Sequence, residues 1–370
     1  MRRLTVVQLL PALDAGGVER STLEIADALA RGGHRAIVVS AGGRLLPRLL
    51  DIGAEHVTLD IGRKSPLALR HVRALRALFR EVDANIVHAR SRLPAWLGWW
   101  ALRGMHGKRP HFVTTAHGLN SPSRYSAIMA RGERVICVSG TVREYLLAHY
   151  PATDPARLVV IPRGIDPATF PHVPHPGLEA RARIADLHPQ LAGEAPLLLL
   201  PGRGTRLKGH ADAIALLARL RANGLDARLW MPGVVQAGRE DYLTELEAMA
   251  GEAGIDDALA MTEPTADMAT AYAASDLVLQ LSRKPEAFGR TVVEALSVGR
   301  PVLGWAHGGV GELLRELQPA GAVAPFDGDA LLRSARDLLA QPPMSPATMP
   351  YTLQAMQEAT LAQYQSLVEA

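Results

Sequence analysis

Short apolar runs alternate with longer amphipathic stretches along most of the chain. In the first half, the runs predict buried strands, and residues 18–31 carry an apolar residue every three or four positions, as a helix that covers a sheet would. This alternation predicts an α/β fold with parallel sheets covered by helices. The strands expected in the first half are residues 4–10, 36–40, 85–89, 112–115, 135–138 and 158–161.

A segment rich in proline and histidine, residues 167–196, interrupts this pattern, and a second series of strands follows it. A chain of 370 residues also exceeds the usual size of one hydrophobic core. We therefore predict a first Rossmann-like domain over residues 1–168, a linker and second domain over residues 169–345, and a C-terminal helical segment over residues 346–370. The strands expected in the second domain are residues 197–200, 228–231, 259–262, 277–281 and 301–305.

The composition, 48% hydrophobic and 21% charged residues, is that of an ordinary globular protein. The single cysteine, Cys137, excludes an intrachain disulfide and a cysteine zinc cluster, and we expect a cytoplasmic protein without a signal peptide. The longest apolar run, residues 93–102, has about half the length of a membrane span.

Charge is distributed unevenly along the chain. Residues 1–165 contain 24 Lys and Arg against 12 Asp and Glu, a balance of +12, whereas the remainder has 16 against 25, a balance of −9. The basic half predicts an anionic partner. Nucleic acid is disfavoured because no reading motif or stacking pattern is present. An anionic membrane surface or a phosphorylated acceptor fits better.

Two glycine-containing loops lie between a predicted strand and a predicted helix, where backbone amides favour an anion. The loop at residues 201–209 adds two cations, Arg203 and Lys208, which together would hold a diphosphate without a divalent metal. Gly16 and Gly17 follow the first strand and would let the backbone approach a phosphate closely. No Gly-x-Gly-x-x-Gly fingerprint is present, which disfavours an NAD-dependent oxidoreductase.

Three further residues are placed where open α/β sheets bind ligands, at the carboxyl ends of strands. Glu286 follows a strand, Glu294 lies in the second turn of the next helix, and His117 follows a strand of the first domain. Carboxylates accept strong hydrogen bonds from sugar hydroxyls, so the two acids suit a ligand rich in hydroxyl groups. The alternatives are two solvated glutamates and a structural histidine.

The segment 93–102 contains three tryptophans and lies among basic residues, a combination typical of membrane interfaces, although a core helix explains it equally well. The candidate residues for acceptor or membrane contact are Arg90, Arg92, Trp96, Trp99, Trp100 and Arg103. The sequence has no His-Glu-x-x-His, Gly-x-Ser-x-Gly or Walker motif, which removes support for a zinc hydrolase, a serine esterase or a P-loop kinase.

The ordered combination of Gly16-Gly17, Arg203…Lys208-Gly209, Glu286-x7-Glu294 and Gly308-Gly309-x-x-Glu312 resembles the retaining glycosyltransferases of family 4. The resemblance spans nearly the whole chain and is greatest to bacterial enzymes of lipopolysaccharide-core or surface-polysaccharide synthesis. It implies the GT-B fold, two Rossmann-like domains facing each other across a cleft, with the last helix returning to the first domain.

The resemblance also implies roles for individual residues. The catalytic residues would be His117, Arg203, Lys208 and Glu286, with the two cations stabilising the diphosphate leaving group. The donor-binding residues would be Gly16, Gly17, Arg203, Lys208, Glu286, Ala287, Phe288, Gly289 and Glu294. Many relatives have Asn in place of Arg163, and Leu in place of Gly204, a change that we expect to loosen the loop.

From these features we expect a metal-independent transferase, without a cofactor, that moves a hexose from a nucleotide-diphosphate sugar to a glycan or glycolipid acceptor that can carry phosphate. A UDP-sugar is favoured, with a GDP-sugar as the alternative. We expect a cytoplasmic location, peripheral to the inner membrane. Two alternatives stay open: an epimerase or hydrolase of sugar nucleotides, and a non-catalytic nucleotide-sugar-binding protein.

Overall fold

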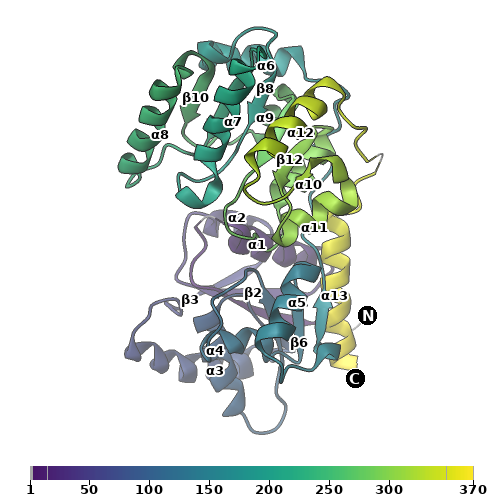
Figure 1. The fold of residues 1–370 in the computed structure, drawn as a ribbon. Helices are drawn as coiled ribbons and strands as arrows, with labels where there is room; N and C mark the ends of the chain where they lie inside the picture. Colours follow the sequence, from purple (N-terminus) through teal and green to yellow (C-terminus); the bar gives the residue numbers. More distant parts are fainter. Residues whose placement is uncertain (1–2, 15, 347, 370) are drawn as a thin grey trace. The chain divides into compact units, whose positions relative to one another are not determined.

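A computed structural model describes residues 3–14, 16–346 and 348–369 of the chain (Figure 1). The chain divides into two compact units. The first unit ends at Arg163 and also takes up the segment from Leu353 onward, and the second unit is Gly164–Thr352. The boundaries expected from the sequence were 168 and 346, close to these positions.

The first unit contains a parallel sheet of seven strands in the order β3-β2-β1-β4-β5-β6-β7. Its strands are β1 Thr5–Leu9, β2 Arg35–Ser40, β3 Glu55–Thr58, β4 Ile86–Ala89, β5 His111–Ala116, β6 Arg134–Cys137 and β7 Leu158–Val160. Its helices are α1 Gly17–Arg31, α2 Leu46–Asp51, α3 Arg70–Glu81, α4 Arg92–Arg103, α5 Gly140–His149 and α13 Leu353–Glu369. The central strands are almost fully buried, as strands covered on both faces must be.

The last helix, α13, packs against α1 of the same unit (yellow and purple in Figure 1). The amide of Gln357 donates to the backbone oxygen of Glu24 at 2.7 Å, and the guanidinium of Arg31 donates to Gln357 at 2.9 Å. The hydroxyl of Tyr364 reaches the Nδ1 atom of His88 on β4 at 2.5 Å, and both residues are buried. The helix is thus fixed to the first unit by buried polar contacts as well as by apolar packing.

The second unit contains a parallel sheet of six strands in the order β10-β9-β8-β11-β12-β13. Its strands are β8 Leu197–Leu199, β9 Arg228–Pro232, β10 Leu259–Thr262, β11 Leu277–Gln280, β12 Val302–Trp305 and β13 Ala322–Val323. Its helices are α6 Leu178–Leu187, α7 His210–Ala222, α8 Glu240–Ala253, α9 Met268–Ala274, α10 Arg290–Val298, α11 Gly308–Leu317 and α12 Gly328–Ala340.

Both sheets reverse their strand order once, between β1 and β4 in the first unit and between β8 and β11 in the second. At such a point the two connections leave the sheet in opposite directions, so a crevice forms beyond the carboxyl ends of the strands. The sequence segments that follow these four strands are the places where each unit would bind a ligand.

Among the described residues, no helix is both long and apolar enough to cross a membrane.

Candidate active site

The strand reversal of the second unit brings together Lys208 and Glu286, two residues that are 78 positions apart. Lys208 follows β8 and Glu286 follows β11, the neighbouring strand. The Nζ atom of Lys208 donates to the Oε1 atom of Glu286 at 2.5 Å. Both side chains keep about a quarter of their surface exposed, 29% and 23%, so the pair is open to a ligand.

Other polar groups hold the Glu286 carboxylate in place. The hydroxyl of Ser282 donates to Oε1 at 2.5 Å, and the amide of Gln280 donates to Oε2 at 3.4 Å. The backbone oxygen of Glu286 accepts from the amide of Gly309 at 2.8 Å. A Cβ atom on Gly308 would lie 2.6 Å from that same oxygen, so the glycine pair at the start of α11 lets two loops meet.

The loop between β8 and α7 is closely packed. A Cβ atom on Gly204 would lie 2.1 Å from the carbonyl oxygen of Val234, and one on Gly209 would lie 2.1 Å from that of Leu281. The expectation that Gly204 loosens the loop is therefore wrong, because glycine is what allows the loop to touch its neighbour. This packing presents Lys208 next to the N-terminus of α7, where the helix dipole favours an anion.

Arg203 lies on the same loop with an exposed side chain and forms no ion pair with any described residue. Lys208, by contrast, already has a carboxylate partner. A diphosphate that binds here would therefore contact two cations and the helix N-terminus. It would compete with Glu286 for Lys208.

The remaining candidate residues of the second unit lie on the segment that leads into α10. Gly289 has a φ of +107°, a conformation that favours glycine, and it is the cap residue directly before the helix. Phe288 is buried against the ring of Tyr351, and Ala287 is half-buried. Glu294 is only 6% exposed and accepts a hydrogen bond from the hydroxyl of Tyr272 at 2.9 Å. It is thus a buried acid rather than one on the helix surface.

Sequence reasoning missed one Asp-x-Asp pair, Asp327 and Asp329, a spacing that some metal-dependent transferases use. Asp327 caps α12 by accepting from the amide of Ala330 at 2.9 Å, and Asp329 pairs with Arg219 at 2.6 Å on the surface. Within the described residues, no group of three or more His, Cys, Asp or Glu side chains is arranged to hold a metal ion. The helix cap and the surface ion pair therefore account for the two aspartates as structural residues.

Sequence reasoning also missed His210, which is fully buried at the first position of α7. Burial lowers the pKa of its imidazole to about 4, although backbone groups of Gly202 and Thr205 act in the opposite direction. The neutral ring lies against the loop between β8 and α7, and the Tyr242 ring packs at 5.9 Å from it. His210 is a part of the loop's support.

We expect the protein to lose stability as the pH falls from 7 to 5. The unfolded His210 takes up a proton near pH 6.5 and the folded one only near pH 4, so the unfolded state binds more protons between these values. The stability contributed by the neutral ring is complete above pH 6.5, and about 2 kcal/mol of it is lost by pH 5. Burial lowers the pKa of His88 and His117 as well, which adds to the effect.

Urea unfolding at pH 7 and pH 5 measures this loss. The variant His210→Gln should show a smaller difference between the two pH values than the unchanged chain. His106→Gln, which alters an exposed histidine, is the matched control and should leave the difference unchanged. An equal pH dependence in His210→Gln and in the unchanged chain would contradict the role given to burial.

The strand reversal of the first unit carries a second polar cluster. Arg90 follows β4 and is 2% exposed, and its guanidinium donates to Gln8 at 2.7 Å and to Ser21 at 3.2 Å. Arg163 donates to the same Ser21 hydroxyl and also to the Nδ1 atom of His117. Since Nδ1 accepts this bond, the Nε2 atom of a neutral His117 carries the proton. Burial, followed by the charges of Arg163 and Arg90, lowers the pKa of His117 well below its usual value.

A pocket of about 310 Å³ opens at this cluster. Its polar walls include Arg90, Arg92, His117 and Glu19, and we call it the polar pocket. Gly16 and Gly17 lie at the start of α1, next to Glu19. The strand reversal of the first unit thus carries a polar pocket.

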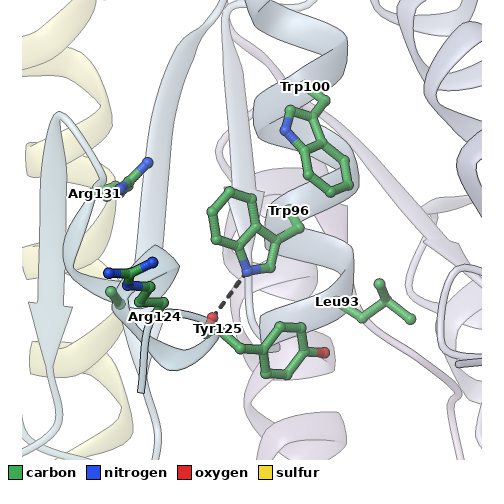
Figure 2. Close-up of a pocket in the computed structure, with 7 residues that line it drawn as sticks. Leu93, Trp96, Trp100, Arg124, Tyr125 and Arg131 are labelled. Carbon is green, nitrogen blue, oxygen red and sulfur yellow. Dashed lines mark hydrogen bonds between the residues drawn. The ribbon is translucent and has the colours of Figure 1, made fainter. Parts of the chain in front are cut away.

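The tryptophan-rich segment forms α4, which is a core helix on one face and exposed on the other. Ala95, Leu97 and Ala101 are buried, whereas Trp100 is 38% exposed. Figure 2 shows the outer face, where a pocket of about 540 Å³ lies beside α4. It is lined by Leu93, Trp96, Trp100, Arg124, Tyr125, Ala127 and Arg131, and we call it the tryptophan pocket. Trp99 and Arg103 stack on each other next to it, with the guanidinium 4.7 Å from the ring.

Comparison with known families agrees with this geometry. The profile of Glycosyltransferase Family 4 matches residues 15–169, and the profile of Glycosyl transferases group 1 matches residues 187–352. The first match covers most of the first unit and the second covers most of the second unit.

Two relatives match different shares of the chain. The D-inositol 3-phosphate glycosyltransferase of Xylanimonas cellulosilytica is 29% identical over 80% of this chain and 77% of its own length. The lipopolysaccharide 1,2-N-acetylglucosaminetransferase of Salmonella typhimurium is 27% identical over 53% of this chain and 51% of its own length. Two further D-inositol 3-phosphate glycosyltransferases match over only 41% and 42% of their length, so the chain spans less than half of these relatives.

Solved structures match the whole chain. A glycosyltransferase from Rickettsia africae is 25% identical, with a TM-score of 0.87 over 100% of this chain and 99% of the other. HepE of Anabaena, solved in complex with UDP and glucose, is 18% identical, with a TM-score of 0.79 over 98% and 100% of the two chains. WaaG, a glycosyltransferase involved in lipopolysaccharide biosynthesis, is 21% identical, with a TM-score of 0.66 over 98% and 97%.

The two doubly wound units and these structures define the protein as an α/β enzyme of the GT-B fold, which confirms the fold class expected from the sequence. The chain belongs to glycosyltransferase family 4, and it is a glycosyltransferase.

Proposed function

We propose that this enzyme transfers a hexose from a UDP-sugar to an anionic glycan or glycolipid acceptor, with retention of anomeric configuration and without a metal ion. The observation that carries the proposal is the meeting of Lys208 and Glu286, beside Arg203, at the strand reversal of the second unit. Cations beside a helix N-terminus suit a diphosphate, and a carboxylate beside them suits sugar hydroxyls.

In this proposal the chemistry is leaving-group stabilisation by fixed charges. The bond between the anomeric carbon and the diphosphate oxygen breaks, and Lys208 and Arg203 stabilise the charge that develops on the diphosphate. The acceptor oxygen bonds to the anomeric carbon on the same face, and its proton passes to a donor phosphate oxygen. Glu286 holds the donor hydroxyls, and Glu294, although buried, is proposed for the ribose. His117 is proposed to contact the sugar.

Known proteins support the substrate classes. HepE binds UDP and glucose, which favours a UDP-sugar over the GDP-sugar alternative. The relatives named for D-inositol 3-phosphate and for lipopolysaccharide both have acceptors that can carry a negative charge, in agreement with the basic first half of this chain. A role in lipopolysaccharide-core or surface-polysaccharide synthesis is our proposal for the pathway.

We further propose a cytoplasmic enzyme that associates with the inner-membrane surface. Its binding to vesicles containing anionic lipid should decrease several-fold from low to high salt, because screening shortens the reach of exposed charges to about 10 Å at 0.1 M salt. Co-sedimentation with vesicles measures this, and neutral vesicles are the control. Binding that is equally strong in low and high salt would exclude electrostatic association.

Assays of nucleotide release test the proposed reaction. UDP release from UDP-glucose should increase strongly when an extract containing acceptors is added, and it should persist in EDTA. A hydrolase or epimerase would act on the donor equally well without an acceptor, and a binding protein would release no UDP. A thermal-shift screen of UDP- and GDP-sugars identifies the donor, because a ligand of the native state raises the melting temperature. The anomeric proton coupling of the product then reports retention or inversion.

A further inference from the structure

The polar pocket of the first unit contains hydrogen-bond donors that have no acceptor. The Nη2 atom of Arg90 and the Nε2 atom of His117 are buried, and neither has a hydrogen-bond partner among the described residues. Both residues line the pocket. A buried donor without an acceptor costs free energy, so the pair indicates a ligand that brings acceptor atoms.

The charge of this pocket specifies the ligand further. Arg90 and Arg92 both line it, and Arg163 lies directly behind His117. Neither Arg90 nor Arg92 forms an ion pair with a carboxylate of the described residues, and Glu19 is the one acid of the pocket wall. Guanidinium groups match phosphate and carboxylate in geometry as well as in charge. The pocket therefore suits an anionic group.

The tryptophan pocket has the opposite character, because its walls are rings and aliphatic carbons. Its volume of about 540 Å³ lies within the usual ~300–1,000 Å³ of ligand pockets. The indole of Trp96 is fixed by a hydrogen bond from Nε1 to the backbone oxygen of Tyr125 at 2.9 Å, drawn in Figure 2, and Arg131 stacks over it at 5.5 Å. The charged groups lie at its edge, where Arg124 and Arg131 are exposed without ion pairs among the described residues.

The same two elements build both pockets. From α4, Arg92 lines the polar pocket and the next residue, Leu93, lines the tryptophan pocket. From the 3₁₀ helix Ser126–Ala130, Met129 lines the first and Ala127 lines the second. The guanidinium of Arg92 lies 5.3 Å from the centre of the Tyr125 ring, a wall of the tryptophan pocket. An anion site and an apolar site thus adjoin each other within one unit.

We propose that the acceptor is an anionic amphiphile, with its phosphate or carboxylate group in the polar pocket against Arg90 and Arg92 and its hydrocarbon chain in the tryptophan pocket. This inference rests on the proposed function, because it names the acceptor class for the same reaction. The hydrocarbon of such an acceptor is the occupant of the tryptophan pocket because the arginine-lined polar pocket adjoins it and two arginines lie at its edge.

Calorimetry on the full chain saturated with UDP tests the proposal, since UDP occupies the donor site. Three probes are compared below micelle-forming concentrations: dodecyl phosphate, inorganic phosphate and a neutral dodecyl glycoside. Dodecyl phosphate should bind at least about tenfold more tightly than either of the others, because each buried methylene adds to the affinity of the head group. Inorganic phosphate should compete with it.

Two variants separate the pockets. Trp100→Ala should weaken the binding of dodecyl phosphate about tenfold, since it removes an exposed ring of the apolar wall. The binding of inorganic phosphate should be unchanged. Arg90→Gln should weaken the binding of both dodecyl phosphate and inorganic phosphate. If this variant of a buried residue does not fold, the competition between the two phosphates on the unchanged chain still tests the proposal. Leu178→Ala, at an 85% exposed leucine, and Arg333→Gln, at an exposed arginine, both in the second unit, are the matched controls.

The proposal would be overturned if the neutral glycoside bound as tightly as dodecyl phosphate, or if Trp100→Ala left the affinity for dodecyl phosphate unchanged. It would also be overturned if the protein bound anionic vesicles but not dodecyl phosphate, because this face would then be a bilayer contact only. Calorimetric binding of UDP alone, measured on the same protein, reports the donor site. If UDP binds and dodecyl phosphate does not, the acceptor proposal fails while the proposed function stands.

Discussion

Replacing Lys208 with alanine should lower kcat for sugar transfer by a factor of about 10² or more, the effect expected when one preorganised charge at a leaving group is lost. Lys208 is held at its position by the carboxylate of Glu286, 2.5 Å away, on a loop whose glycines pack against neighbouring carbonyls. The charge is thus in place before the donor binds. Steady-state kinetics with UDP release as the readout measures the change.

Lys284→Ala is the matched control, because Lys284 is an exposed lysine of the same unit. It should leave kcat within the error of the unchanged enzyme. UDP affinity of the double variant Lys208→Ala/Glu286→Gln separates the missing cation from an unpaired carboxylate, since the double variant removes both charges. UDP binding that stays weak in the double variant assigns the loss to the cation. Near-normal turnover in Lys208→Ala would exclude Lys208 from leaving-group stabilisation.

Replacing Glu286 with glutamine should lower kcat by roughly 10- to 100-fold, since a hydrogen bond to a charged group contributes about 1.5–3 kcal/mol. Free UDP should bind as tightly as before or more tightly, because the change frees Lys208 from its carboxylate partner. Transfer kinetics and calorimetry with UDP separate the two effects.

The control for this variant is Glu247→Gln, at an exposed glutamate on α8. A parallel loss of UDP affinity and kcat in Glu286→Gln would indicate that Glu286 only supports the shape of the loop. Its proposed contact with the donor sugar would then be wrong.

The pattern of apolar residues was sufficient to predict most strands of both sheets, because a parallel strand covered on both faces is a continuous apolar run. It missed β3 and β13, for a physical reason in each case. Residues Glu55–Thr58 form an edge strand with exposed and half-buried side chains, and Ala322–Val323 is only two residues long. Neither segment has the length or the apolar content that makes a strand visible in a sequence.

The site was predictable only in part. Motifs and their order indicated Lys208 and Glu286, and the strand reversal explains why residues so far apart meet. No sequence pattern predicted the ion pair between Lys208 and Glu286. Sequence reasoning also gave no role to Arg163, whose bond to His117 depends on long-range folding, and it did not weigh His210. The roles assigned to the candidate donor and acceptor residues stay predictions.

A crystal structure of the enzyme with UDP, grown in EDTA, tests the central claim most directly. The account predicts that both phosphates contact the Lys208 ammonium, the Arg203 guanidinium and the backbone amides at the start of α7, with Lys208 released from Glu286. Phosphates bound away from these cations, or a nucleotide that binds only after a divalent metal is added, would contradict it.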